Sequence, residues 1–322
     1  MVLTRLTIGV DVGGTNVRAA IVDTKGRILN RLVEKSDKAS GPLGLSRQIA
    51  RMVHALDPKG RIRRIGVGSA GPLDLKSGAI VGSPHLRYRR IPLVEPLEEL
   101  LGASVSLVND CVAAAAAEKM YGRGRGHANL VYVTLSTGIG AGVYVDNRLL
   151  SGKDGNAHEV GHITIDHSGA LACGCGRRGH WEAYCGGDYT PNFVKYQLKM
   201  KSPAEVESSM ISRIVGGDLT RLRSEDLFRC AKAGDAIAKA IVKEMGRLNA
   251  IGFANVTAAY DPELITVGGA IAIENPSLVI RPIRRWIRDY SINRPPRIEV
   301  TRLGEEIVLL GAVALASGRE PH

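Results

Sequence analysis

Short blocks of aliphatic and β-branched residues alternate along the chain with longer segments whose apolar residues recur at helical spacing. Residues 6–12 (LTIGVDV) are almost continuously apolar, and residues 16–23 (NVRAAIVD) alternate after a GGT turn, which predicts two strands. Residues 24–29 (TKGRIL) extend this pair as a hairpin. The apolar spacing of residues 44–56 predicts a helix that ends before Pro58.

The rest of the chain repeats this alternation. Residues 64–74 predict a strand that enters a Gly/Pro turn, and 104–108 predict a strand followed by a helix that opens at Asn109 or Asp110 and closes by Gly122. A strand pair is expected within 129–150, single strands over 263–271 and 297–301, and helices over 188–201, 203–216, 224–232, 234–259, 276–289 and 307–318. Strands that alternate with helices indicate an α/β fold, in which ligands bind at the strand ends.

The composition and the N-terminal residues indicate the cellular compartment. The chain has 322 residues, 44% of them hydrophobic, with a mean hydropathy of -0.01, and this length suits two domains. No window approaches the ~18 consecutive apolar residues that a membrane helix needs. The N-terminus runs directly into the first strand without a signal-peptide pattern, and five cysteines are too few for a secreted disulfide scaffold. We therefore expect a cytoplasmic protein with no membrane partner.

The chain is basic, with a formal net charge of +11, which raises the possibility of a nucleic-acid partner. The basic residues fall in short groups at 59–64, 87–90 and 281–288, and no helix-turn-helix, zinc-finger or RNA-binding signature accompanies them. Net charge bears on solubility and association, not on fold. We expect solvated faces, or attraction of an anionic substrate, and no specific nucleic acid.

Three glycine-rich turns follow predicted strands, at 11–15 (DVGGT), 135–143 (LSTGIGAGV) and 266–271 (TVGGAI). Glycines let backbone N–H groups approach a phosphate, although each of the first two turns taken alone is equally a plain tight turn, and the third taken alone favours a simple strand-to-helix turn. Together they predict a nucleotide held by loops from two lobes. The candidates are Asp11, which would hold Mg²⁺ through water, with Gly13, Gly14, Thr15, Thr137 and Gly138 for phosphate and Gly268 and Gly269 for the adenosine side.

Two other patterns resemble known motifs without their context. Residues 66–71 (GVGSAG) match G-x-G-x-x-G, but Pro72 follows, no helix opens there, and no acidic residue lies about 20 positions on. Residues 158–162 (HEVGH) match the H-E-x-x-H pattern of metalloproteases, which requires a helix, whereas Gly161 and the flanking ITID favour a strand or turn. No G-x-x-x-x-G-K-[ST] is present, so a P-loop is excluded.

Two polar clusters remain. Asn109-Asp110 at a strand end is either an N-cap or a substrate-orienting Asn109 beside a general base, Asp110, for phosphoryl transfer. The second cluster supplies four side chains of the type that structural zinc prefers, although its C-x-C spacing is tighter than usual and incidental thiols are the alternative. Its members are His162, Cys173, Cys175 and His180.

The set of blocks resembles the ROK family of sugar kinases and related repressors, over nearly the whole chain. The blocks, in the family's order, are IGVDVGGTNVRAAIVD, GVGSAGPLD, VNDCVAAAAAE, LSTGIGAGVYVD, EVGHITID, CGCGRRGHWEAY, DPELITVGGAI and LLGAVALA. The resemblance implies an α/β, actin-like ATPase-domain (ribonuclease H-like) fold with two lobes around an interlobe cleft. The smaller lobe would comprise 1–110 and 304–322, and the larger lobe, 111–303, would carry the zinc segment and a homodimer surface.

The same resemblance implies ATP·Mg²⁺-dependent phosphorylation of a sugar hydroxyl, commonly the 6-OH. It assigns Asp110 as the base and structural zinc to the four-residue cluster. The sugar ligands that it implies are Gly71, Asn109, Asp110, Glu159, His162 and Glu182. The Trp-Glu-x-Tyr sequence at 181–184 resembles glucokinase members, so we expect glucose or a broader hexose set as substrate.

Two departures and two rival functions stay open. His180 stands where the family usually has a third cysteine, and His85 stands where many relatives have Asn near the sugar loop. The resemblance therefore leaves zinc occupancy and the choice of sugar undecided. N-acetylmannosamine, or another N-acylhexosamine, is the rival substrate. A sugar-responsive repressor is the rival class, although the phosphate loop here begins within about eleven residues of the first residue.

Overall fold

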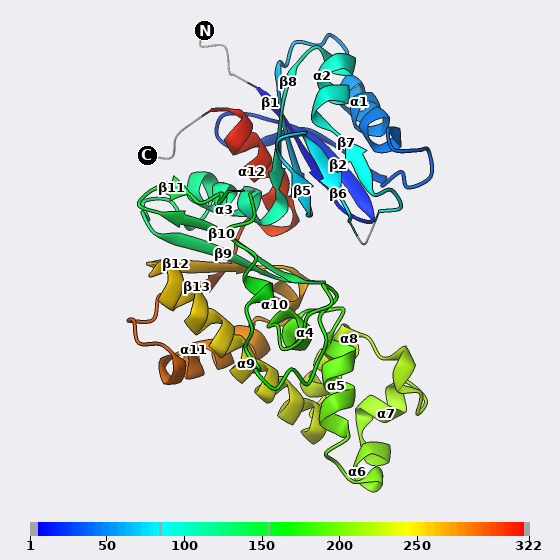
Figure 1. Ribbon diagram of the computed structural model, residues 1–322, viewed down its shortest axis with the longest axis vertical. Helices are drawn as coiled ribbons and strands as arrows, with labels where there is room; N and C mark the ends of the chain where they lie inside the picture. Colours follow the sequence, from blue (N-terminus) through cyan, green and yellow to red (C-terminus); the bar gives the residue numbers. More distant parts are fainter. Residues whose placement is uncertain (1–5, 84–85, 154, 319–322) are drawn as a thin grey trace. The chain divides into compact units, whose positions relative to one another are not determined.

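The computed structural model describes residues 6–83, 86–153 and 155–318 (Figure 1). The chain divides into two compact units. The first comprises Met1–Tyr132, Gly142–His158 and Arg302–His322, and the second comprises Val133–Ala141 and Glu159–Thr301. The lobe boundaries expected above stay a prediction; these units differ from them by assigning residues 111–132, 142–158 and 302–303 to the first unit.

The first unit is built on a five-stranded sheet. Its strand order is β3 (Ile28–Lys35), β2 (Asn16–Val22), β1 (Thr7–Val12), β4 (Arg64–Ser69) and β8 (Ser104–Asn109). The first three strands pair antiparallel, whereas β1, β4 and β8 run parallel. In register, Val12 lies opposite Ser69, and Ser69 lies opposite Asn109. The parallel strands therefore end at one edge, where an α/β sheet exposes its ligand-binding groups.

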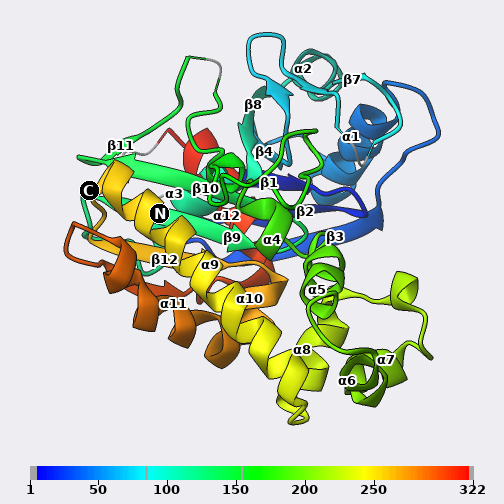
Figure 2. The same cartoon turned by 60° about the horizontal axis from the view of Figure 1, so that its bottom comes forward.

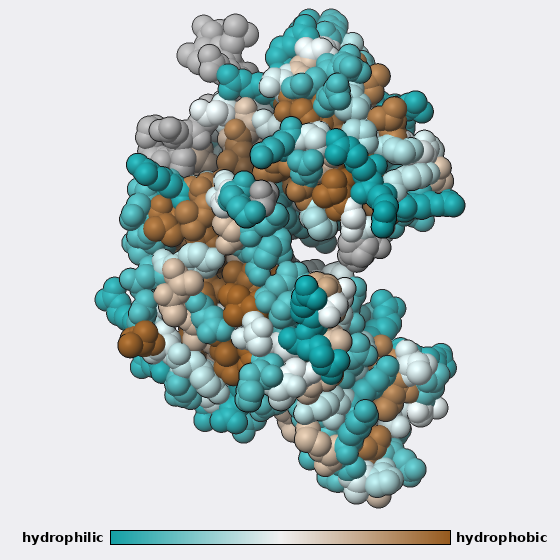
Figure 3. Space-filling view, in the orientation of Figure 1, coloured by the Kyte–Doolittle hydropathy of each residue, from teal (hydrophilic) through white to brown (hydrophobic). Residues whose placement is uncertain are grey.

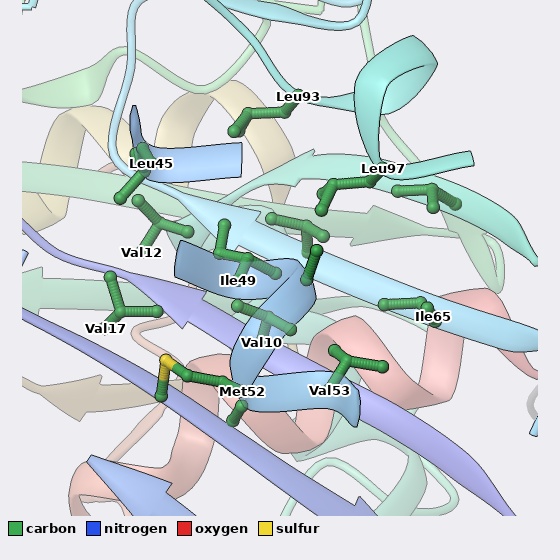
Figure 4. Packing of buried hydrophobic residues seen from close by; sticks show 14 of the residues in the cluster. Val10, Val12, Val17, Leu45, Ile49, Met52, Val53, Ile65, Leu93 and Leu97 are labelled. Atoms are coloured by element: carbon green, nitrogen blue, oxygen red, sulfur yellow. The ribbon is translucent and has the colours of Figure 1, made fainter. Parts of the chain in front are cut away.

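One face of this sheet packs against α1 (Gly44–Leu56) and α2 (Val94–Leu101). Figure 4 shows side chains of α1, among them Ile49 and Met52, beside Val10 and Ile65 of the sheet, and all four are fully buried. A small three-stranded sheet completes this unit, with strands β5 (Leu73–Asp74), β6 (Ala79–Val81) and β7 (Arg90–Pro92).

The opposite face packs against α12 (Ile307–Ala316), which lies beside α3 (Asp110–Tyr121) in both cartoon views (Figures 1 and 2). Glycines permit this close approach, because a methyl group on Gly66 would lie 2.0 Å from the Ala312 carbonyl oxygen. The GVGSAG turn therefore uses its first glycine for helix packing, which agrees with our exclusion of a dinucleotide site there.

The second sheet has the strand order β11 (Arg148–Leu149), β10 (Ile139–Val145), β9 (Leu130–Leu135), β12 (Leu264–Gly268) and β13 (Arg297–Val300). Strands β9 and β10 contribute residues to both units. In the second unit, β12 and β13 pair parallel. This pairing places the end of β12, where the third glycine-rich turn begins, at the same edge as the end of β13.

Helices make up most of the second unit. The long helix α9 (Ala236–Tyr260) packs along α11 (Pro276–Tyr290), as Figure 2 shows. The remaining helices are shorter: α4 (Glu182–Cys185), α5 (Thr190–Leu198), α6 (Pro203–Ser208), α7 (Met210–Ile214), α8 (Ser224–Lys232) and α10 (Ala270–Glu274). Among the described residues, no helix combines the length and apolarity needed to cross a membrane. On the face that Figure 3 draws, hydrophilic residues cover most of the surface.

The strands expected from the sequence are present, and most helices lie within a few residues of their expected bounds. One prediction is wrong: residues 203–216 form two helices. Ser209 has an extended backbone, so it ends α6, and its side chain accepts the Ser212 N–H as the N-cap of α7. Helix α2 was not predicted, because its eight residues include Pro96 and only Leu97 is fully buried.

Candidate active site and metal-binding cluster

Asp11 lies near the end of β1 and is only 8% exposed. Arg18 on β2 donates a hydrogen bond to its carboxylate at 3.1 Å. Burial raises the pKa of Asp11 to about 6 despite this partner, and the nearby negative charge of Asp110 adds to the rise. The carboxylates of Asp11 and Asp110 are therefore close enough to repel each other. A divalent cation bound near them would reduce this repulsion.

Residues 13–15 form a tight turn between β1 and β2, closed by a 2.9 Å hydrogen bond from Gly13 N–H to the Asn16 carbonyl. The Ser36 hydroxyl donates to the Gly13 carbonyl at 2.7 Å and holds the turn from the side. Gly14 and Thr15 form the tip of the turn, and Thr15 is exposed. The structure therefore shows a tight turn here, which both interpretations expect, and the phosphate role of these residues stays a prediction.

Asn109 ends β8 and is the N-cap of α3, because its side-chain oxygen accepts the N–H groups of Cys111 at 2.8 Å and Val112 at 3.3 Å. This cap leaves the amide nitrogen free of the helix. A methyl group on Gly71 would lie 3.6 Å from that nitrogen. The structure therefore brings together two of the expected sugar ligands, Gly71 and Asn109, at the edge where the parallel strands end.

Asp110 is the first residue of α3, and its carboxylate accepts the Cys111 N–H at 2.8 Å. Burial raises the pKa of Asp110, while this hydrogen bond and the neighbouring His158 oppose the rise. His158 is buried in the same unit and was not predicted as a neighbour of Asp110. A carboxylate with a raised pKa accepts a proton more readily than an ordinary surface aspartate, which suits a general base.

In the second unit, residues 136–139 form a turn in which Ser136 N–H donates to the Gly138 carbonyl at 3.0 Å. Glu182 of α4 accepts the Ile139 N–H at 2.9 Å. Thr137 is exposed at the tip of this turn. Gly138 and Glu182, predicted for phosphate and sugar respectively, are therefore direct neighbours.

The third glycine turn joins β12 to α10. Gly269 has φ of +85°, and a methyl group there would lie 2.3 Å from the Leu135 carbonyl oxygen. Both facts require glycine at position 269 for structural reasons alone. The strand-to-helix interpretation is confirmed, and contact of Gly268 and Gly269 with a nucleotide stays a prediction.

The four expected metal ligands do come together. One ligand atom from each of His162, Cys173, Cys175 and His180 lies within 4.8 Å of all the others. The Cys173 Sγ is 3.7 Å from His162 Nδ1, and the Cys175 Sγ is 3.3 Å from His180 Nδ1. Zn–S bonds of about 2.3 Å and Zn–N bonds of about 2.0 Å place tetrahedral ligands roughly 3.3–3.8 Å apart. The donor set and these two distances therefore fit zinc.

A tight loop gathers the cysteines. Cys173 N–H donates to the Arg177 carbonyl at 2.8 Å, and Gly176, with φ of +83°, turns the chain between them. Burial, together with the nearby Glu182 and Cys175, raises the pKa of the Cys173 thiol to about 12. A bound cation would favour the thiolate instead.

His162 faces two groups with its two ring nitrogens. Nδ1 faces Cys173, and Nε2 lies 3.8 Å from the carboxylate of Glu159. Residues Val160–His162 form a short 3₁₀ helix, so the HEVGH segment is not the α-helix that a metalloprotease requires, and the rejection of that motif is confirmed.

Trp181 anchors the segment that carries Glu182. It is fully buried, its indole N–H donates to Asn249 of α9 at 2.9 Å, and its ring packs edge-on against Phe253. A methyl group on Gly252 would lie 2.3 Å from that ring. Sequence reasoning missed Asn249 and Gly252, because they lie 68 or more positions from Trp181 within an ordinary helical pattern. Arg18 was missed as well, and His85 lies outside the described residues.

The chain matches the family model described as "ROK family" over residues 7–319, and it belongs to that family. It is 38% identical to a glucokinase of Pyrobaculum calidifontis, over 96% of this chain and 94% of the relative, and 36% identical to a glucokinase of Aeropyrum pernix, over 96% of each. These matches confirm the family expected from the sequence.

Solved structures agree. A ROK family glucokinase from Streptomyces griseus, in complex with glucose and AMPPNP, has a TM-score of 0.78 and 32% identity, covering 98% of this chain and 100% of the other. A ROK hexokinase from Thermus thermophilus has a TM-score of 0.80 and 31% identity, covering 97% and 98%. The expected fold class is confirmed: the chain has the α/β, actin-like fold of its family.

Proposed function

We propose that this protein is an ATP-dependent hexose kinase that transfers the γ-phosphate of ATP to the 6-hydroxyl of glucose or of a broader hexose set. The relatives that match nearly the full chain at 38% and 36% identity are glucokinases. The placement of Asp110 is the structural observation that carries the proposal, because its carboxylate has the raised pKa and the strand-end position that the reaction requires of its base.

In this mechanism Asp110 accepts the proton of the sugar hydroxyl as that oxygen attacks in line. Asn109 orients the sugar through the amide nitrogen that its capping role leaves available. Asp11 would help to hold Mg²⁺, and the ion would supply positive charge that neutralises the transferring phosphoryl group. In the first unit Gly14 and Thr15 would offer their N–H groups to phosphate, because that of Gly13 is bonded to Asn16, and in the second unit Thr137 and Gly138 would do so.

Structural zinc is part of the proposal. His162, Cys173, Cys175 and His180 would hold it, and its positive charge would fix the loop that carries Glu182 beside the short helix that follows Glu159. Glu159 and Glu182 would then accept hydrogen bonds from the sugar. We further propose that the enzyme is a cytoplasmic homodimer.

Replacing His180 with Ala should remove one of four ligands and lower the zinc content of the purified protein from about one ion per chain to well below it. Metal analysis by mass spectrometry checks this result. His127→Ala is the control, because His127 is a histidine that does not belong to the cluster. Wild-type protein purified without added chelator and found free of zinc would refute the metal site.

A coupled ADP-release assay with glucose, mannose, fructose and N-acetylmannosamine tests the proposed activity and its rival substrate. We expect the highest kcat/KM with glucose. A preference for N-acetylmannosamine would instead favour the N-acylhexosamine kinase, and no turnover with any of the four sugars would contradict the proposed function and leave the repressor as the rival.

A further inference from the structure

The Glu182 carboxylate connects the metal-binding cluster to the turn at residues 136–139, here called the 136–139 loop. One carboxylate oxygen, Oε2, accepts the Ile139 N–H at 2.9 Å, and the other, Oε1, lies 3.5 Å from the Sγ of Cys173 in the cluster. A methyl group on Gly138 would lie 2.5 Å from Oε2. The glycine therefore admits the carboxylate directly against the backbone of the loop.

Two more hydrogen bonds attach the same loop to the chain that follows α4. Gly187 N–H donates to the Ser136 carbonyl at 2.7 Å, and Asp188 N–H donates to the Thr137 carbonyl at 3.1 Å. Three of the loop's backbone groups are thus bonded to residues 182–188. The loop takes its conformation from this segment as well as from the strands β9 and β10 on either side of it.

The segment 182–188 is itself tied to the cluster and to the core. Ala183 N–H donates to the carbonyl of His180, a cluster residue, at 3.0 Å. Trp181 holds the start of α4 against α9 through its hydrogen bond to Asn249. The cluster is therefore connected to the 136–139 loop through α4, whose start is held against α9 by the buried Trp181.

We propose that Glu182 is a positioning residue for the 136–139 loop, and that metal bound at the cluster tightens nucleotide binding by holding α4 and this loop in place. The proposal rests on the proposed function, which assigns Thr137 and Gly138 to the phosphates. A loop that is already ordered loses less conformational entropy when it binds a ligand, so nucleotide affinity reports its order. Glu182 would then act on both substrates, through hydrogen bonds to the sugar and through the loop for the nucleotide.

Isothermal titration of Mg²⁺·AMPPNP into the full-length protein without sugar tests the role of Glu182. Glu182→Ala removes the acceptor of the Ile139 N–H, and we expect it to weaken nucleotide binding by about tenfold, as loss of a charge-assisted hydrogen bond does. Glu182→Gln keeps a carbonyl oxygen at this place and should bind the nucleotide within about twofold of wild type. Both variants should lose glucose affinity. A general loss of structure would not weaken nucleotide binding in the Ala variant alone while both variants lose glucose affinity.

Glu159→Ala is the matched control. Glu159 lies beside His162, but within the described part of the chain its carboxylate forms no hydrogen bond with the 136–139 loop. It should weaken glucose binding and leave nucleotide binding unchanged. Thermal unfolding of every variant confirms that each is folded. Unchanged nucleotide affinity in Glu182→Ala, or equal losses in the Ala and Gln variants, would overturn the positioning role.

The effect of the metal is tested with Cys175→Ser, which alters an exposed cluster residue whose thiol faces His180. We expect a lower zinc content together with weaker nucleotide binding, whereas Cys230→Ala, a buried thiol on α8, should retain both. Loss of zinc with unchanged AMPPNP affinity would overturn the coupling and leave the kinase proposal intact. Wild-type protein that binds no AMPPNP would instead contradict the proposed function itself.

Discussion

Replacing Asp110 with Asn should lower kcat for glucose phosphorylation by about 10²–10⁴-fold, the range typical for loss of a general base. Asn has nearly the same shape as Asp, and its amide oxygen can still accept the Cys111 N–H that Asp110 binds at 2.8 Å. The variant therefore keeps the start of α3 but has no group that takes the hydroxyl proton. Steady-state kinetics with glucose and ATP, and glucose titration by calorimetry, measure the two effects separately.

Glucose affinity should fall much less than kcat, because binding of the sugar does not need the proton transfer. Asp146→Asn is a suitable control, since Asp146 lies in the tight turn between β10 and β11 and belongs to none of the predicted sites. If Asp110→Asn turned over any of the sugars at close to the wild-type rate, Asp110 would not be the general base.

Replacing Arg18 with Met should move the acid limb of the pH–rate profile to higher pH. Burial and the charge of Asp110 already raise the pKa of Asp11 to about 6, and Arg18 is the one cation that opposes this rise among the causes that act on it. Without the guanidinium the pKa of Asp11 rises further, by about one unit for a nearby charge removed. Because Mg²⁺ needs the ionised carboxylate, activity should decline from a higher pH as the solution is acidified.

The measurement is kcat/KM for Mg²⁺·ATP from pH 5 to 9 in wild type and variant. Arg51→Met is the control, because Arg51 pairs with Glu34 and neither residue is among the groups that act on the pKa of Asp11. An acid limb at the same pH in both proteins would show that Asp11 does not govern it. The sign for stability is the opposite of that for activity: a raised carboxyl pKa favours the folded state below about pH 4, and this contribution is lost as the pH rises toward 6.

The sequence predicted the order of strands and helices well, because the apolar spacing is regular in both units. It predicted the metal cluster from residue type alone, and the four side chains do converge. Local patterns could not reveal Arg18 beside Asp11 or Asn249 beside Trp181, since these pairs depend on how strands and helices pack. The end of α6 at Ser209 could not be predicted either, because a serine within a helical pattern does not indicate whether its backbone is helical or extended.

The three glycine turns show that a glycine in the sequence can indicate either close packing or a ligand-binding loop. Gly269 is explained by its positive φ and by the carbonyl of Leu135, and Gly138 by the carboxylate of Glu182. The same residues remain suited to a nucleotide, because a glycine that admits protein atoms on one side leaves its N–H groups accessible on the other. Glycine content alone could not distinguish packing from phosphate binding, and for these turns the two are compatible.

The dependence of the first unit on α12 bears on how the chain folds during synthesis. Gly66 and Gly311 let α12 lie directly against β4 and α3. One face of the first unit's sheet therefore stays uncovered until residues 307–316 have left the ribosome. Residues 159–301 of the second unit, by contrast, emerge as one continuous stretch before that point. The first unit is therefore completed after the second, and until then the apolar face of its sheet needs protection from aggregation.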